Sequence, residues 1–328
     1  MSAFSTLIGQ PQAVELLTSA IANNRVASAY LFSGPAGVGR SLAAIEFSVL
    51  LLAREQNFSS VRHKVENQNH PDLLLVEPTY LHQGKLLTEA QAQAEGLKRK
   101  AQPQIRVEQI REITRFLSQP PWESSRAVVI IDAAHTMAEA AANALLKTLE
   151  EPGQATIILI APSADALLPT LVSRCQRIPF SRLAQAEMKQ VLTQTDHQEI
   201  IEQDTVLAIA QGSPGEAITA SQHLQTISPD LLQQLETLIT HQEQSSLETV
   251  TLALNLAKEI TTTLDFTVQI WLIDYLQQCY WKNHSYCEIS QSVLRGLKQL
   301  ETSRQLLLNY VQPRLVWEVA FLEITNHA

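Results

Sequence analysis

The sequence has 328 residues, enough for two or three domains, and 45% of them are hydrophobic, which excludes global disorder. The formal net charge of −9 argues against a protein that coats DNA by bulk electrostatic attraction. We see no signal-peptide pattern at the N-terminus and no apolar run near the roughly 18–20 residues that span a bilayer, so we expect a cytoplasmic protein with no membrane partner.

Up to about residue 180, short apolar runs alternate with longer amphipathic ones. The short runs lack polar alternation and predict buried strands at residues 29–32, 72–78, 127–132 and 156–161. The longer runs repeat at helical spacing and predict helices at residues 11–24, 41–53, 107–119 and 138–153. Between them, residues 54–70 are polar and poor in periodicity. Such strands separated by helices predict a parallel sheet covered on both faces, that is, an α/β domain.

Beyond residue 180 the pattern becomes helical. Residues 183–221 are typical of short helices, and from about residue 225 onward the pattern predicts helices only. Ser228 and Pro229 match an N-cap and a first-turn proline. The glutamine-rich region 222–244 is a candidate boundary between the second and third parts of the chain.

The first strand runs into GPAGVGRS, which has the form of a phosphate-binding loop. In the pattern G-x-x-x-x-G-K-[ST], Gly34, Gly39 and Ser41 match, and Arg40 replaces the lysine. Glycines permit the tight turn that points backbone N–H groups at phosphate oxygens, and the following helix adds its positive end. A strand before the motif and a helix after it favour a true phosphate loop. The candidate nucleotide-binding residues are Gly34, Pro35, Ala36, Gly37, Val38, Gly39, Arg40 and Ser41.

Two positions of this candidate site differ from those of a working ATPase. Arg40 would neutralise phosphate charge, but its longer, planar group would misplace the transition-state contact that lysine makes. Asp132 ends a strand and is the acid expected to hold Mg²⁺ through water. The next position, where such ATPases carry a glutamate base, holds Ala133, and we interpret the nearby His135 as a partly exposed polar residue. Both changes damage hydrolysis rather than the fold.

These segments resemble a known family. AYLFSGPAGVGRS, NHPDLLLVEP, IRVEQIREI, VVIIDAAHTMAEAAANALLKTLEEPG and LLPTLVSRCQRIPF, in this order, look like the delta-prime subunits of the bacterial DNA polymerase III clamp loader. The likeness covers most of the first 220 residues and returns in LLLNYVQPRLVWEVAFLEI near the end. NALLKTLEEP combined with SRC is typical of bacterial clamp-loader AAA+ subunits.

The resemblance implies an α/β AAA+ fold with three domains. They would be a RecA-like P-loop domain with a parallel sheet at residues 1–180, a small helical lid at 181–222 and an all-α collar at 223–328. It implies a heteropentamer with motor subunits (gamma/tau) and a delta subunit, which opens the sliding clamp and places it on primed DNA. The chain would thus be an accessory subunit of a DNA-directed DNA polymerase complex.

The resemblance also assigns roles to single residues. Arg174, in SRC, would be an arginine finger that reaches the ATP of the adjacent subunit and stabilises charge on the transferring phosphoryl group. Spacing alone favours a simpler role, in which Arg174 or Arg177 pairs with an acid such as Glu150 or Glu151.

Two nucleotide-sensing positions of the family can be located in this sequence, and only one of them holds a polar residue. Ser163 would fill a small polar sensor position beside the phosphates, or else it caps the helix that follows. Gly215 stands where many AAA+ relatives carry a nucleotide-sensing arginine, so that sensor is missing. We interpret the basic run Lys98, Arg99 and Lys100 as a solvated loop rather than a DNA site.

Zinc is not expected. Family members commonly carry a four-cysteine zinc module before the HPD segment, but here that stretch has no cysteine, and His63 with His70 cannot make a tetrahedral site. The cysteines of the chain are scattered and fit thiols of a reducing cytosol: Cys175, Cys279 and Cys287.

We therefore predict a clamp-loader subunit with a degenerate ATP site that supplies Arg174 to a neighbour. ATP or ADP would bind the loop at most structurally, with Mg²⁺ only if nucleotide is bound. One alternative is an active motor subunit of the gamma/tau type, and a less favoured one is a stand-alone P-loop kinase or GTPase. Four aromatic residues of the collar are core or inter-subunit surface, and we expect core for each: Trp271, Tyr275, Trp281 and Trp317.

Overall fold

A computed structural model describes residues 4–53, 58–95, 102–240, 247–283 and 291–325. By its internal contacts the chain divides into two compact units. Unit 1 comprises residues 1–191 and 212–215, and unit 2 comprises residues 192–211 and 216–328. These contacts join most of the predicted lid to the helical unit. The division into three domains stays a prediction.

Unit 1 contains a parallel sheet, as predicted. Its five strands within the described residues are β1 Ala29–Ser33, β2 Leu73–Val76, β5 Ala127–Ile131, β6 Ala155–Ala161 and β7 Gln176–Pro179. Their order is β2-β5-β6-β1-β7, and all neighbouring pairs are parallel. Because parallel strands end at the same edge, the segments that follow β1, β2, β5 and β6 gather at one edge of the sheet.

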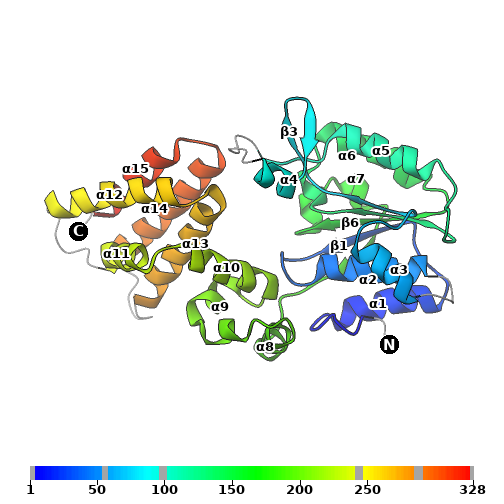
Figure 1. Cartoon of the computed structure of the whole chain (residues 1–328), viewed down its shortest axis with the longest axis horizontal. Coiled ribbons are helices and arrows are strands. Elements are labelled where there is room, and N and C mark those ends of the chain that lie inside the picture. The colour runs from blue at the N-terminus through cyan, green and yellow to red at the C-terminus, as the bar shows by residue number, and fades with distance from the viewer. Residues whose placement is uncertain (1–3, 54–57, 96–101, 241–246, 284–290, 326–328) are drawn as a thin grey trace. The chain divides into compact units, whose positions relative to one another are not determined.

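Both faces of the sheet are buried. In β1, Tyr30 and Phe32 enter one apolar cluster and Leu31 enters the other. Helices α1 Pro11–Ala22, α2 Arg40–Leu52 and α3 Phe58–Glu66 cover the first face, and α5 Val107–Leu117, α6 Glu139–Glu150 and α7 Pro169–Val172 cover the second (Figure 1). This two-sided burial explains why the strands read as continuous apolar runs without polar alternation.

The structure adds elements that the pattern did not predict. Helix α3 lies in the polar stretch 54–70, where Arg62 makes a bidentate ion pair with Glu46, a buried acid of α2. A hairpin formed by β3 Tyr80–His82 and β4 Lys85–Leu87, followed by α4 Glu89–Ala94, stands between β2 and α5. Helix α3 depends on a tertiary contact, so periodicity alone could not reveal it.

All secondary-structure elements described in unit 2 are helices, as predicted. The helices from the end of unit 1 onward are α8 Gln185–Gln194, η3 Gln198–Glu202, α9 Asp204–Ala210, α10 Pro214–Thr226, α11 Pro229–Thr240, α12 Leu247–Thr263, α13 Phe266–Asn283, α14 Gln291–Leu308 and α15 Pro313–Thr325. Helix α15 packs against α12 and α14, and α13 packs against α9, α11 and α14.

The core of unit 2 contains most of the collar aromatics. Trp317 is fully buried, and its Nε1 donates to Gln269 Oε1 at 3.0 Å. Trp271 and Tyr275 are also buried, as predicted. The prediction for Trp281 was wrong: this residue of α13 is 49% exposed.

Candidate nucleotide site and exposed arginine

The GPAGVGRS segment forms a loop between β1 and α2, as a phosphate loop does. Gly39 directly precedes α2 and has a φ of +103°, a conformation that other residues adopt only with strain. A Cβ atom at Gly39 would also lie 2.8 Å from Leu7 Cδ1. Glycine is therefore required where the loop turns into the helix.

The side chain of Arg40 is bound to the backbone of the protein. Its Nη1 donates to the carbonyl oxygen of Ala161, the last residue of β6, and the same oxygen accepts from the Gly34 N–H at 3.3 Å. The guanidinium thus joins the start of α2 to the edge of the central sheet. The lysine of a working loop would instead reach the outer phosphates.

Residues 212–215 of unit 1 lie against the phosphate loop. Ser213 Oγ donates to the Ala36 carbonyl at 2.8 Å, and the Gly215 N–H donates to the Gly37 carbonyl at 3.0 Å. A Cβ atom on Gly215 would lie 2.7 Å from Gly37 Cα. A sensing arginine has no room at Gly215 in this arrangement, which gives a physical reason for its absence.

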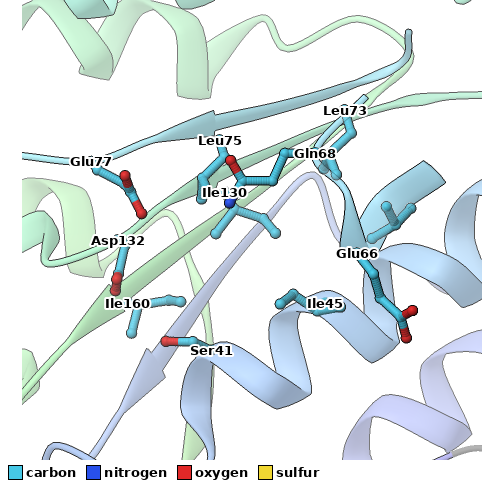
Figure 2. Close-up of a pocket in the computed structure, with 11 residues that line it drawn as sticks. Ser41, Ile45, Glu66, Gln68, Leu73, Leu75, Glu77, Ile130, Asp132 and Ile160 are labelled. Carbon is cyan, nitrogen blue, oxygen red and sulfur yellow. The ribbon is translucent and has the colours of Figure 1, made fainter. Parts of the chain in front are cut away.

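An acidic pair closes one end of a cavity beside the loop. Glu77 and Asp132 follow Val76 and Ile131, which are paired across β2 and β5. Both acids and Ser41 line a cavity of about 160 Å³, and Figure 2 shows the three side chains at the same end of it. The rest of the lining is mainly apolar: Ile45, Val65, Leu73, Leu75, Ile130 and Ile160.

Charges at this edge influence one another. Burial raises the pKa of Glu77, and the neighbouring negative charge of Asp132 raises it further. Burial lowers the pKa of the Arg40 guanidinium, whereas Asp132 acts in the opposite direction. Burial also lowers the pKa of His135, and the positive charge of Arg40 adds to this effect, which Asp132 opposes. Arg40 keeps its positive charge at neutral pH, because arginine side chains are not deprotonated there.

The position after Asp132 holds no catalytic group. Ala133 has a left-handed backbone with φ +45°, and its N–H donates to Asp132 Oδ1 at 2.8 Å. His135 is exposed, in line with its interpretation as a polar surface residue. Ser163 stands at the N-cap position of the short helix η2 Ala164–Ala166, but its side chain makes no capping hydrogen bond. Ser163 is exposed.

The backbone of the loop fits a bound phosphate. The contacts of Ser213 and Gly215 use carbonyl oxygens of the loop, not the N–H groups that a phosphate needs. Ser41 and Asp132 line one cavity, the arrangement expected of residues that hold Mg²⁺ beside phosphates. Arg40 would have to leave the Ala161 carbonyl to reach a phosphate. The residues therefore fit ATP or ADP as ligands better than they fit hydrolysis.

Arg174 lies on different elements from the loop. It follows α7, and its side chain is 37% exposed. Nη2 donates to Glu150 Oε1 at 2.6 Å, and Nη1 donates to the Thr170 carbonyl at 3.0 Å. The ion pair expected from spacing alone is therefore present, and it leaves the arginine at the surface.

Sequence reasoning missed two features of this site. Glu77 ends a strand beside that of Asp132, and the acids in LLLVEP and VVIIDA were the signal that could have revealed the pair. The contact between Gly215 and the loop had no such signal, because it joins residues far apart in the sequence.

The described residues contain no group of three or more His, Cys, Asp or Glu side chains that could hold a metal ion. Burial raises the pKa of Cys175 and of Cys279 to about 11, so both thiols are neutral at physiological pH. Cys287 and the basic run at residues 98–100 lie outside the described residues. No helix in the described ranges is both long and apolar enough to cross a membrane.

Comparison with known families accounts for nearly the whole chain. Residues 9–184 match a family model described as DNA polymerase III, delta subunit. Residues 186–324 match a model described as the C-terminal domain of cyanobacterial DNA polymerase III delta prime. The chain belongs to the DNA polymerase III delta-prime family. The resemblance seen in the sequence is thereby confirmed.

Individual members of the delta-prime family show moderate similarity to the chain. The delta' subunit of Bacillus subtilis is 33% identical over 193 residues, and that of Pseudomonas aeruginosa is 30% identical over 197 residues. Each match covers 57% of this chain but only 52% and 54% of the relatives, so the chain spans about half of their length. The tau subunit of Bacillus subtilis is 28% identical over 221 residues, which cover 65% of this chain and 35% of that protein.

The fold of this delta-prime family member also occurs in a solved structure. A DNA polymerase III gamma subunit-related protein of Thermotoga maritima aligns with a TM-score of 0.55 and 17% identity, over 94% of this chain and 98% of that one. At this identity the match bears on fold alone. It agrees with the predicted AAA+ architecture of a parallel-sheet domain followed by helices.

Proposed function

We propose that this chain is a clamp-loader subunit that does not hydrolyse ATP itself and supplies Arg174 to the ATP site of a neighbouring subunit. Membership in the delta-prime family supports the assignment to the clamp loader. Its partners would be gamma/tau motor subunits and a delta subunit in a heteropentamer that loads the sliding clamp on primed DNA.

One observation carries the proposal for the ATP site. Arg40 donates to the Ala161 carbonyl, and Ala133 stands where a base would polarise the attacking water. When bound, ATP or ADP would place its phosphates against the N–H groups of the loop, and Ser41 and Asp132 would hold the accompanying Mg²⁺. Such a nucleotide would stabilise unit 1 by mass action.

The proposal for Arg174 follows from its exposure and chemistry. A guanidinium at the surface can stabilise negative charge on a phosphoryl group presented by another chain, an effect worth roughly 10³ to 10⁵ in rate at such sites. Within the described residues, the loop makes hydrogen bonds with Gln10, Ala161, Ser213 and Gly215, and none of them involves Arg174.

The test compares ATP turnover by the isolated chain and by the reconstituted complex with primed DNA and clamp. We expect negligible turnover by the chain alone. In the complex, Arg174→Ala should lower turnover at the neighbouring site by a factor on the order of 10³, whereas Arg177→Ala, the matched control, should leave it unchanged. Turnover by the isolated chain that survives Arg174→Ala and is abolished by Asp132→Ala would contradict the proposal.

A second candidate, an active motor subunit, is favoured only by the similarity to tau. The combined substitutions Arg40→Lys and Ala133→Glu separate the two candidates. A motor subunit should already hydrolyse ATP without them. In the function proposed, the isolated chain should gain ATP turnover only after both changes, because each restores one missing group.

A further inference from the structure

The C-terminal end of α6 carries two consecutive acids, but only one of them meets a cation among the described residues. Glu150 Oε1 pairs with Arg174 Nη2 at 2.6 Å. Glu151, the C-cap residue that follows the helix, is exposed. Negative charge at this end of a helix is unfavourable, because the helix dipole places partial negative charge there. Arg174 offsets that cost at Glu150.

A second contact fixes the other arm of the guanidinium. Nη1 of Arg174 donates to the Thr170 carbonyl at 3.0 Å. Thr170 belongs to α7 and Glu150 to α6, so two separate elements hold the two terminal nitrogens. Arginine has five N–H donors. Its described partners use two of them, which leaves three that can meet an anion.

The pair contributes little to the stability of the fold. The side chains of Arg174 and Glu150 are 37% and 53% exposed, and ion pairs at such positions contribute little because water and salt screen them. The pair has a larger effect on the orientation of the Arg174 side chain than on stability. A free arginine side chain must lose its rotamer freedom when it meets a phosphate, and a side chain held beforehand avoids that loss in the transition state.

On the basis of the function proposed above, we propose that Glu150 is a positioning residue for Arg174. It holds the guanidinium in one orientation, so that N–H donors not used within the chain stay available to the ATP of the neighbouring subunit. Glu150 itself touches no substrate. Its effect on catalysis passes through Arg174 and should vanish when Arg174 is absent.

The test uses the full-length chain assembled with its motor and delta subunits. Glu150→Gln removes the charge and keeps the size, and Glu151→Gln makes the same change one residue later as a control. We expect Glu150→Gln to lower kcat for ATP turnover about three- to tenfold with KM unchanged, because ATP binds to the neighbour's own loop. Glu151→Gln should match the unsubstituted complex.

A double-mutant cycle separates positioning from a structural role. In the Arg174→Ala background, Glu150→Gln should cause no further loss, and the isolated variants should unfold at the same temperature. Equal kcat for Glu150→Gln and Glu151→Gln would overturn the inference, as would a further loss in the Arg174→Ala background. If Arg174→Ala alone keeps full turnover, the proposed function fails instead.

Discussion

Asp72 is a buried acid whose backbone partners hold a loop of unit 1. Its carboxylate accepts three backbone N–H bonds, from Trp122 at 2.6 Å, Glu123 at 2.9 Å and Ser124 at 2.7 Å. Burial alone would raise the pKa of Asp72, but these three hydrogen bonds outweigh it and hold the pKa below its ordinary value. The charged form of Asp72 therefore stabilises the folded state.

Replacing Asp72 by asparagine should destabilise unit 1 by about 2–4 kcal/mol, because an amide nitrogen would face N–H donors in a buried site. Because the pKa of Asp72 is lower in the folded than in the unfolded protein, its charged form stabilises the fold at pH values above the unfolded pKa of about 3.9. This stabilisation is lost as the pH falls through the folded-state pKa. Urea unfolding as a function of pH measures both effects.

The wild type should lose stability as the pH falls below about 4, and Asp72→Asn should lack this pH-dependent loss because it has no carboxylate to protonate. Asp165→Asn, which changes an exposed acid of η2, serves as the control and should alter stability by less than about 0.5 kcal/mol. If Asp72→Asn lost as much unfolding free energy below about pH 4 as the wild type does, Asp72 would not control this pH dependence.

At the phosphate loop, the identities of single residues were enough to predict a loss of ATP hydrolysis. Arg40 and Ala133 are visible in the sequence as departures from an ATPase, and their chemistry follows from residue type alone. That Arg40 binds the Ala161 carbonyl was not predictable, because the partner lies on a strand far along the chain.

Among the elements, those with a strong period were predicted best. The four apolar strands and the helices at α1, α2, α5 and α6 all occur within a few residues of their expected bounds. Helix α3 was missed, because the bidentate pair between Arg62 and Glu46 attaches it to α2. Polar sequences of this kind carry no periodic signal, so the contact cannot be read in advance.

The first turn of α10 provides a prediction at the scale of an element. Gly215→Ala adds a Cβ atom that would lie 2.7 Å from Gly37 Cα, so backbone must move. Alanine is the better helix former by roughly 1 kcal/mol, but the clash with backbone should exceed this and destabilise unit 1 by about 1–3 kcal/mol. Exchange of the amide at position 215 should accelerate, because its N–H bond to the Gly37 carbonyl is lost.

Gln222→Ala tests helix propensity alone, because Gln222 is exposed on the same helix. It should leave exchange of the amide at position 215 unchanged. If Gly215→Ala were as stable as the wild type and kept slow exchange at position 215, the close approach of Gly215 to Gly37 would be refuted.

At the scale of the whole molecule, we predict that a substitution in the core of one unit destabilises that unit and not the other. Trp317 fills the core of unit 2, and Trp317→Ala should destabilise that unit by about 3–5 kcal/mol while leaving the sheet of unit 1 intact. Hydrogen exchange should accelerate in α12, α14 and α15 but not in β1, β5 and β6. Trp281→Ala, at a half-exposed position, should change stability by about 0.5 kcal/mol or less. Equal loss of protection in both units would contradict this independence.

The sequence by itself determined the parallel sheet, the helical second half and the resemblance to the delta-prime family, and it predicted that the phosphate loop is degenerate. These features depend on residue type, short-range order and periodicity, which a linear sequence carries in full. The sequence also singled out Arg174, and it offered an ion pair of Arg174 or Arg177 with an acid such as Glu150 or Glu151.

Only the tertiary structure decided which long-range partners are used. It placed Ser213 and Gly215 on the phosphate loop, Glu77 beside Asp132, and Trp281 on an exposed face. It also selected Glu150 over its neighbour Glu151 as the partner of Arg174. Such choices depend on distances of a few ångströms between segments far apart in the chain, and no local pattern encodes them.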